Sequence, residues 1–214
     1  PVTQLYVSID APNKELMKTV DIPLFEDYWE RFLLSLDYLA QKKERTCVRL
    51  TIIKGVNDIE LNNYARLIER SDSDFIEVKS YMHVGESQHR LESKNMPLHE
   101  DIVEFCETLV KYLNDYEIVS EHIPSRVVML AKKKFNVDRE WMTWIDFEKW
   151  NELINSLRSG NSTGVNVEEY WKKTPSVGLS GKGTLDTVHE SLKKKLLKEH
   201  GYDVAEDVEE IELD

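Results

Sequence analysis

Residues 46–53 read TCVRLTII, and this run decides the fold. Two sets of side chains alternate along it: Val48, Leu50 and Ile52 in one, Cys47, Arg49 and Thr51 in the other. Because successive side chains of a β-strand point to opposite faces, one face of this strand is apolar and the other is polar. The run therefore predicts a strand that packs one face against a core and leaves the other for water or a ligand.

The same alternation recurs on both sides of this run, at residues 5–10 and 75–79. Apolar residues at helical spacing follow each strand and predict three helices, over 23–43, from 57 or 58 onward, and over 99–113. Strands that alternate with helices predict a parallel sheet with the helices packed on one side.

Local signals refine these elements. Pro23 suits a first helical turn, and Asn57 can cap the second helix, with Glu60 three residues later. The remaining expectations are two short strands at 117–121 and 127–132, an extension opened by an aromatic cluster (Trp141, Trp144, Phe147, Trp150), a loop at 160–164, a helix over 185–200 and an acidic tail at 206–214.

The polar faces of the three parallel strands carry a second signal, formed by Ser8, Asp10, Arg49, Thr51, Glu77 and Lys79. Parallel strands are usually apolar on both faces, and a closed, packed barrel interior would not tolerate so many unpaired charges. An open or partial barrel with a wet cavity near the C-terminal strand ends would hold them. Half-polar strands are also typical of a solvated antiparallel sheet, so both interpretations stand.

Composition narrows the class of protein. The chain has 214 residues, with 40 acidic and 28 basic side chains and a net charge of −12, so bulk electrostatics do not favour nucleic-acid binding. No apolar run reaches the length of a membrane span, and no signal peptide is recognisable. Its two cysteines suit a reduced, cytoplasmic protein, and the start at Pro1 is interpreted as lying inside a longer gene product.

Several long runs resemble one family: TQLYVSIDAP (3–12), RLTIIKGVN (49–57), FIEVKSYMHVGES (75–87) and WMTWIDFEKW (141–150). They resemble the wybutosine-synthesising radical S-adenosylmethionine (SAM) enzymes, the tRNA 4-demethylwyosine synthases. YWKKTP (170–175) resembles the eukaryotic form, and the similarity extends from residue 2 to about 183. The resemblance implies an α/β fold, the C-terminal half of a partial (βα)6 TIM-like barrel over 1–134, a family-specific extension over 135–183, and a charged helix and tail over 184–214.

The family condenses pyruvate with N1-methylguanosine in phenylalanine tRNA. This is a lyase reaction of wybutosine biosynthesis that uses SAM and a 4Fe-4S cluster. Eukaryotic members add a flavodoxin-like domain that binds FMN. The cluster motif C-x-x-x-C-x-x-C is absent from this sequence, and Cys47 and Cys106 do not replace it. The resemblance therefore implies that the iron–sulfur ligands and the FMN domain lie outside this segment, which supplies no metal ligand, and that the segment alone is inactive.

The resemblance places cofactor-binding residues at Ser8, Asp10, Arg49, Thr51 and Asn57, where SAM would bind. For three of them a structural alternative stays open: Asp10 can cap the turn before Pro12, Arg49 can pair with Glu77, and Asn57 can cap a helix. Glu77 and Lys79 are the catalytic candidates. Lys79 could pair with Glu77, bind a substrate anion or, with a smaller expectation, form a Schiff base with pyruvate.

Further candidates lie beyond the third strand. His83, Glu86 and His89 do not fit a standard metal spacing and predict a solvated loop near the substrate mouth. Residues that could face tRNA or the active site are Glu121, His122, Ser125, Arg126 and the lysine runs 132–134 and 193–195. Two other function classes remain open. One is a non-catalytic barrel half that docks to a separate partner or binds tRNA, and the other is an unrelated aldolase-like barrel.

Overall fold

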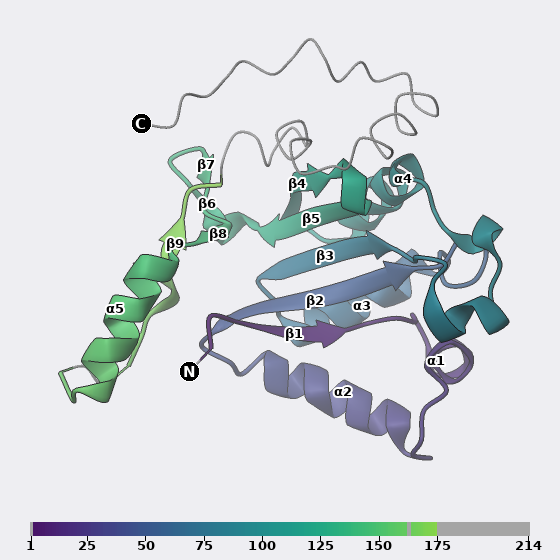
Figure 1. The fold of residues 1–214 in the computed structure, drawn as a ribbon, viewed down its shortest axis with the longest axis horizontal. Helices are drawn as coiled ribbons and strands as arrows, with labels where there is room; N and C mark the ends of the chain where they lie inside the picture. The colour runs from purple at the N-terminus through teal and green to yellow at the C-terminus, as the bar shows by residue number, and fades with distance from the viewer. Residues whose placement is uncertain (1, 162–163, 175–214) are drawn as a thin grey trace, which may run out of the picture.

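A computed structural model describes residues 2–161 and 164–174. A five-stranded sheet in the order β1-β2-β3-β5-β4 forms its centre (Figure 1). The strands are β1 (Gln4–Ser8), β2 (Arg45–Ile52), β3 (Phe75–Ser80), β4 (Tyr116–His122) and β5 (Val127–Lys132). The first three strands are parallel, as the alternation of strands and helices predicts.

Helices cover one face of this sheet. They are α2 (Tyr28–Leu39), α3 (Leu61–Ser71) and α4 (His99–Leu109), whereas α1 (Lys14–Asp21) lies beyond the end of β1 (Figure 1). The apolar side chains Val48, Leu50 and Ile52 of β2 join the core that α2, α3 and α4 bury. The prediction of helices on a single side is therefore correct for these three.

Two helix starts differ from the sequence expectation. The helix expected over 23–43 is shorter and forms α2, whereas α1 precedes this segment at a place where no helix was expected. Ile22 takes a left-handed backbone with φ of 49° and ends α1. Pro23 therefore lies between helices and not in a first turn. Asn57 does not cap α3, since that helix begins at Leu61 and Glu60 precedes it.

The last two strands of the sheet run antiparallel to their neighbours, which corrects the expectation of a parallel sheet for this part. Only residues 123–126, with a short 3-10 turn at Ile123–Ser125, join β4 to β5. Parallel strands need a crossover of a dozen or more residues, so this connection permits only a hairpin.

The extension folds against the opposite, helix-free face of the sheet. It comprises the hairpin of β6 (Asn136–Val137) and β7 (Glu140–Trp141), the pair of β8 (Trp144–Ile145) and β9 (Trp171–Lys172), and α5 (Phe147–Arg158). A second apolar cluster joins it to the sheet through Cys47, Phe75, Val119, Ala131 and Phe135, against which Trp141 and Trp171 pack. The extension thus covers the end of the face where β2 and β3 begin.

Buried Arg45 fastens the extension to the sheet. It is 2% exposed, and its guanidinium donates to the carbonyl oxygens of Thr143 at 2.5 Å and Trp144 at 2.9 Å. The same guanidinium lies 4.5 Å from the ring centre of Phe75. A second link joins the Tyr170 hydroxyl to the carbonyl oxygen of Thr3 at 3.0 Å.

Besides the turn at Ile123–Ser125, short 3-10 helices lie at Gly85–His89, Ser93–Asn95 and Val110–Tyr112. Two more lie at Lys133–Phe135 and Val167–Glu169. Among the described residues, no helix has the length and apolar character that crossing a membrane requires. The expected helix over 185–200, the tail at 206–214 and the lysines 193–195 lie outside the described residues, as does part of the loop at 160–164.

Candidate functional site

The predicted polar side chains meet on the helix-free face of the sheet. Ser8 is the register partner of Arg49, and Arg49 is the register partner of Glu77. The row continues on β5, where Met129 lies opposite Glu77. Four neighbouring strands thus contribute one continuous row, which lies on the side away from the helices.

Arg49 and Glu77 form a two-pronged ion pair at the centre of this row. Arg49 Nε lies 2.9 Å from Glu77 Oε1, and Arg49 Nη2 donates to Glu77 Oε2 at 3.1 Å. Only 12% of the Glu77 side chain is exposed, compared with 41% for Arg49. The alternative in which Arg49 pairs with Glu77 is therefore realised, and the hydrogen bond to Glu77 raises the pKa of Arg49 further.

Tyr6 borders the ion pair, and the sequence interpretation did not single it out. Its ring centre lies 5.0 Å from the guanidinium carbon of Arg49. Burial, followed by the charges of Cys47 and Glu77, raises the pKa of Tyr6 to about 12, so its hydroxyl stays protonated at neutral pH. The signal for Tyr6 was available, because it alternates onto the same face as Ser8.

Asp10 lies where β1 runs out, beside β2. Its Oδ1 accepts the backbone N–H of Thr51 at 3.3 Å, so the carboxylate contacts the neighbouring strand and not the turn at Pro12. Burial raises the pKa of Asp10, although the hydrogen bonds from Thr51 oppose this effect.

Asn57 links the segments that contain Asp10 and Thr51 by hydrogen bonds from a buried position. It is fully buried, and its Nδ2 donates to the carbonyl oxygens of Asp10 and Thr51, both at 2.8 Å. Its Oδ1 accepts the backbone N–H of Ile53 at 2.6 Å. Both N–H donors of the Asn57 amide are thus used inside the chain, and any influence on a ligand would pass through the segments it holds.

Ser8 lies at one end of the row, on β1, whereas Lys79 lies two residues beyond Glu77 on β3, where its register partner is Thr51. Ser8 is exposed and Lys79 is partly exposed. Within the described ranges, no acidic side chain forms an ion pair with the Lys79 ammonium, since Glu77 is engaged by Arg49. The alternative in which Lys79 pairs with Glu77 is therefore not realised.

A cavity of about 290 Å³ lies between this face and the extension. Its lining combines strand residues with the aromatic side chains of the extension: Tyr6, Arg45, Phe75, Met129, Trp144 and Phe147. Trp144 and Phe147 are 50% and 58% exposed, whereas Trp150 packs against Tyr170 with ring centres 4.8 Å apart. The aromatic cluster is therefore only partly packed, and the part around Trp144 borders the site.

Both cysteines are buried and free. Cys47 lies under the extension, and Cys106 lies in the core between the sheet and the helices. Burial raises the pKa of each thiol well above its usual value. Neither is a reactive thiolate, as the sequence interpretation expects.

The loop after β3 keeps its histidines apart. His89 Nε2 lies 3.7 Å from Glu86 Oε2, whereas His83 contacts Tyr81 and does not join that pair. Among residues 2–161 and 164–174, no three histidine, cysteine or carboxylate side chains gather as metal ligands.

The remaining candidates make contacts within the chain. Glu121 Oε2 lies 2.7 Å from His99 Nε2, and the Arg126 guanidinium donates to the carbonyl oxygen of Pro97 at 2.9 Å. The three lysines of the run 132–134 also have partners, which are Asp72, the carbonyl oxygen of Asn114 and Asp74. These lysines are therefore not a free basic surface.

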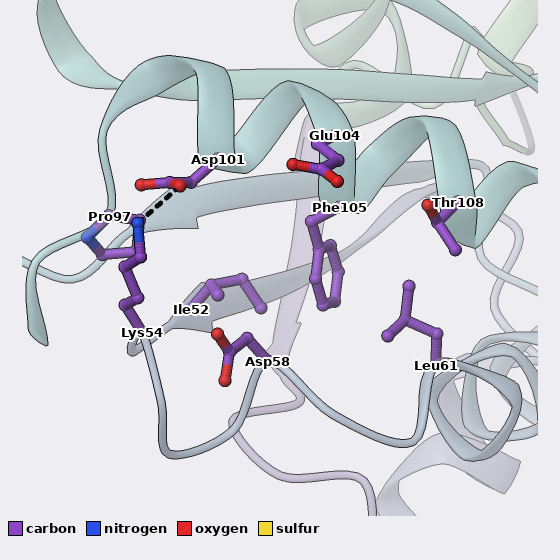
Figure 2. Close-up of a pocket in the computed structure, with 9 residues that line it drawn as sticks. All are labelled: Ile52, Lys54, Asp58, Leu61, Pro97, Asp101, Glu104, Phe105 and Thr108. Carbon is purple, nitrogen blue, oxygen red and sulfur yellow. Dashed lines mark hydrogen bonds and ion pairs between the residues drawn. The ribbon is translucent and has the colours of Figure 1, made fainter.

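A second cavity, of about 270 Å³, lies on the opposite side of the sheet, between β2 and α4 (Figure 2). Its apolar floor includes Ile52 and Phe105, and at one end Lys54 Nζ reaches Asp101 Oδ1 at 2.6 Å. Burial opposes the charged form of Asp101, but the bonds from Lys54 and from the Leu98 N–H outweigh it and lower the pKa of this carboxyl. This cavity is separate from the polar row, because Ile52 belongs to the apolar set of β2.

Comparison with known proteins identifies a matching family and similar solved structures. A family model described as wyosine base formation matches residues 70–132. The structure of TYW1 with a lysine-pyruvate adduct bound aligns with a TM-score of 0.56 and 35% identity, and covers 64% of this chain and 43% of that one. The crystal structure of archaeal TYW1 aligns with a TM-score of 0.50 and 31% identity, over 64% of this chain and 42% of that one.

Three longer relatives match over most of the chain, and all are S-adenosyl-L-methionine-dependent tRNA 4-demethylwyosine synthases. That of Danio rerio is 47% identical over 86% of this chain and 25% of the relative. Those of Homo sapiens and Arabidopsis thaliana are each 44% identical over 85% of the chain, and over 25% and 28% of the relatives. The sequence resemblance is thereby confirmed. The chain belongs with the tRNA 4-demethylwyosine synthases, as the C-terminal part of a protein of that kind, and spans about a quarter of the relatives' length.

Proposed function

We propose that this chain forms the second half of the reaction chamber in a longer enzyme that makes 4-demethylwyosine on tRNA. In that reaction pyruvate condenses with N1-methylguanosine in phenylalanine tRNA, as a step of wybutosine biosynthesis. The observation that carries the proposal is the aligned row of Ser8, Arg49 and Glu77 on the helix-free face of three parallel strands. Such a row lies where an open barrel holds its ligands.

A partial barrel accounts for the open edge of the sheet. β1 is the outermost strand, so one of its sides has no strand neighbour among the described residues. An unpaired strand edge is normally covered or paired in a stable protein. We assign this edge to the preceding half of a six-unit radical SAM barrel, with residues 1–134 as the second half, 135–183 as the extension and 184–214 as a charged tail.

The chemistry of the polar row suits SAM. The Ser8 hydroxyl and the Asp10 carboxylate accept hydrogen bonds from ribose hydroxyls or from an ammonium group, and the Thr51 hydroxyl adds a further polar group. The Arg49 guanidinium matches a carboxylate, which SAM and pyruvate both carry. Asn57 supports this corner by holding the backbone of Asp10 and Thr51.

Lys79 and Glu77 are the catalytic candidates that this chain offers. One solved relative carries a lysine–pyruvate adduct, so a lysine of the complete enzyme holds pyruvate there. We assign Lys79 to the attraction of a substrate anion, because its ammonium has no ion-pair partner in the described part of the chain. Glu77 holds the Arg49 fork in place.

The iron–sulfur cluster does not fit the residues of this chain. A cluster needs several thiolates close together, and the two cysteines are buried in separate cores. We therefore place the 4Fe-4S ligands and the flavodoxin-like FMN domain in the remaining segments, and we expect the chain alone to be an inactive part of a cytoplasmic lyase.

The proposal is tested with a longer protein in which this chain is joined to the remaining segments of one of its relatives. The quantity measured is the product formed on tRNA. We expect tricyclic nucleoside, measured by mass spectrometry of digested tRNA, from the wild type and at least a 100-fold loss with Arg49→Lys, which removes the two-pronged geometry. Glu117→Gln, on exposed β4, is the control and should keep full activity. No product from the wild type would refute the proposed function.

A non-catalytic module is the second candidate, and the edge position of β1 among the described residues favours it. In that case the half barrel would dock to a separate protein through the edge of β1 or bind tRNA without chemistry. Borohydride trapping with labelled pyruvate separates the candidates, because only an enzyme yields a labelled lysine. Peptide mapping then locates the label, and a label on another lysine excludes Lys79 as the Schiff base.

A further inference from the structure

Three hydrogen bonds in series occupy the loop that follows β3. The Ser87 hydroxyl donates to the carbonyl oxygen of Val84 at 2.7 Å, and the Tyr81 hydroxyl donates to Ser87 Oγ at 2.9 Å. The Tyr81 oxygen also lies 3.3 Å from Nδ1 of His83. The chain of contacts therefore runs from a backbone carbonyl to a histidine ring.

The direction of each bond follows from the number of protons available. A carbonyl oxygen only accepts, so the single Ser87 proton points to Val84. Ser87 Oγ must then accept from Tyr81, which commits the only hydroxyl proton of Tyr81. The Tyr81 oxygen is left as an acceptor, and His83 Nδ1 must carry the proton between them.

This arrangement selects one neutral form of the His83 ring. The bond made by one ring nitrogen decides which nitrogen carries the proton. With the proton on Nδ1, Nε2 holds a free lone pair and acts as an acceptor. The hydrogen bonds that link Ser87, Tyr81 and His83, called the relay below, exclude the other neutral form. That form carries the proton on Nε2, and free imidazole side chains favour it.

The surroundings hold the ring in place. Tyr81 is 7% exposed, its N–H donates to the carbonyl oxygen of Ile52 at 2.8 Å, and Gln88 Nε2 donates to the carbonyl oxygen of His83 at 2.8 Å. His83 itself is only partly buried. It follows β3, the strand that carries Glu77 and Lys79, and so lies at the C-terminal end of the polar row.

We propose that His83 is a catalytic residue that accepts a proton from an N–H group of the nucleobase substrate, with Tyr81 and Ser87 as positioning residues. This inference rests on the proposed function, in which pyruvate condenses with N1-methylguanosine, because that base carries an amino group and pyruvate a carbonyl carbon to which it can bond. As the amine lone pair bonds to that carbon, the C=O π bond breaks and its electron pair moves to oxygen, and an N–H bond of the resulting ammonium then breaks with its electron pair staying on nitrogen. The proton moves to Nε2, and neutral imidazole becomes imidazolium.

The tautomer can be measured in this chain without any activity. Nitrogen-15 NMR of His83 in its neutral form should show a protonated Nδ1 and an unprotonated Nε2. Tyr81→Phe removes the acceptor and should shift the ring toward the Nε2–H form. A wild-type ring protonated at Nε2, or a ring unaffected by Tyr81→Phe, would overturn the relay, whatever the fate of the proposed function.

Turnover in the longer enzyme tests the proton transfer. His83→Gln keeps a hydrogen-bond acceptor but cannot hold a proton, and should lower the rate of product formation at least 100-fold. His89→Gln, on the same loop and in contact with Glu86, is the matched control and should retain the wild-type rate. A His83→Gln rate within about threefold of an active wild type would refute the role of His83. An inactive wild type would instead refute the proposed function.

Discussion

Arg49 and Glu77 face each other across β2 and β3, and the two carboxylate oxygens of Glu77 meet two different nitrogens of the Arg49 guanidinium. The pair joins adjacent strands at the centre of the helix-free face. Because Arg49 remains 41% exposed, water reaches the pair and weakens it relative to a fully buried ion pair.

Glu77→Gln should lower the free energy of unfolding by about 1 kcal/mol, because it removes a charge-assisted pair that solvent partly screens. Urea unfolding followed by circular dichroism measures the change. A double-mutant cycle with Arg49→Met should give a coupling energy of about 0.5–1 kcal/mol. A coupling energy of zero would show that the two side chains do not interact in solution.

Asn57→Ala should lower the free energy of unfolding by about 2–4 kcal/mol. The change leaves the buried N–H of Ile53 without its partner and removes the donor to the carbonyl oxygens of Asp10 and Thr51. The measurement is the urea midpoint at constant slope. Asn62→Ala, on the exposed side of α3, is the control and should change stability by less than about 0.5 kcal/mol.

Arg45→Met should release the extension from the sheet. The guanidinium is buried and donates to two backbone carbonyls of the extension, so its loss leaves both unpaired. We expect faster proteolytic cleavage near residues 142–146, with β1–β3 still protected in hydrogen exchange. Arg158→Met, on exposed α5, should leave the cleavage rate unchanged. Equal cleavage rates for both variants would contradict the fastening role of Arg45.

Asp21→Asn should change how stability depends on pH. Burial, followed by the negative charge of Asp10, raises the pKa of Asp21 to about 6, while Arg90 opposes the shift. The folded state thus binds this proton more tightly than the unfolded state, and the contribution of Asp21 to stability falls as the pH rises from about 4 to about 6.

The expected gain for Asp21→Asn at pH 7 is below about 1 kcal/mol, because Asp21 is only partly desolvated: the residue keeps enough exposed surface for solvent to screen its charge. The gain should vanish near pH 3, where the wild-type carboxyl is protonated in both states. Glu15→Gln, also on α1, is the control for loss of a surface charge. A stabilisation by Asp21→Asn that is constant from pH 3 to 7 would contradict the raised pKa.

Much of the central sheet was predictable from residue alternation. The pattern of 46–53 assigns Arg49 and Ile52 to opposite faces, and the structure places them so. The same pattern predicts Ser8, Arg49 and Glu77 on one face, and their register in the sheet confirms it. Whether Arg49 paired with Glu77 stayed open, because alternation gives the face of a residue but not the rotamers that join two side chains.

Other features depend on contacts that no local pattern carries. Ile22 ends α1 by taking a left-handed backbone, although its side chain would suit a continuing helix. The direction of β5 follows from a connection too short for a crossover, which its own residues do not reveal. The carbonyl partners of Arg45 lie almost a hundred residues further along the chain, so its buried position could not be read from its neighbours.

The hydrogen bond from Tyr170 to Thr3 has a consequence for folding during synthesis. The two residues are separated by 167 positions, so a nascent chain emerging from the ribosome presents β1 long before the side chain that secures it. During that interval β2 pairs with the first strand, but the hydrogen bond from Tyr170 to Thr3 is still missing. Slowed translation between these points would therefore lengthen the period in which the unfinished molecule is exposed to mispairing.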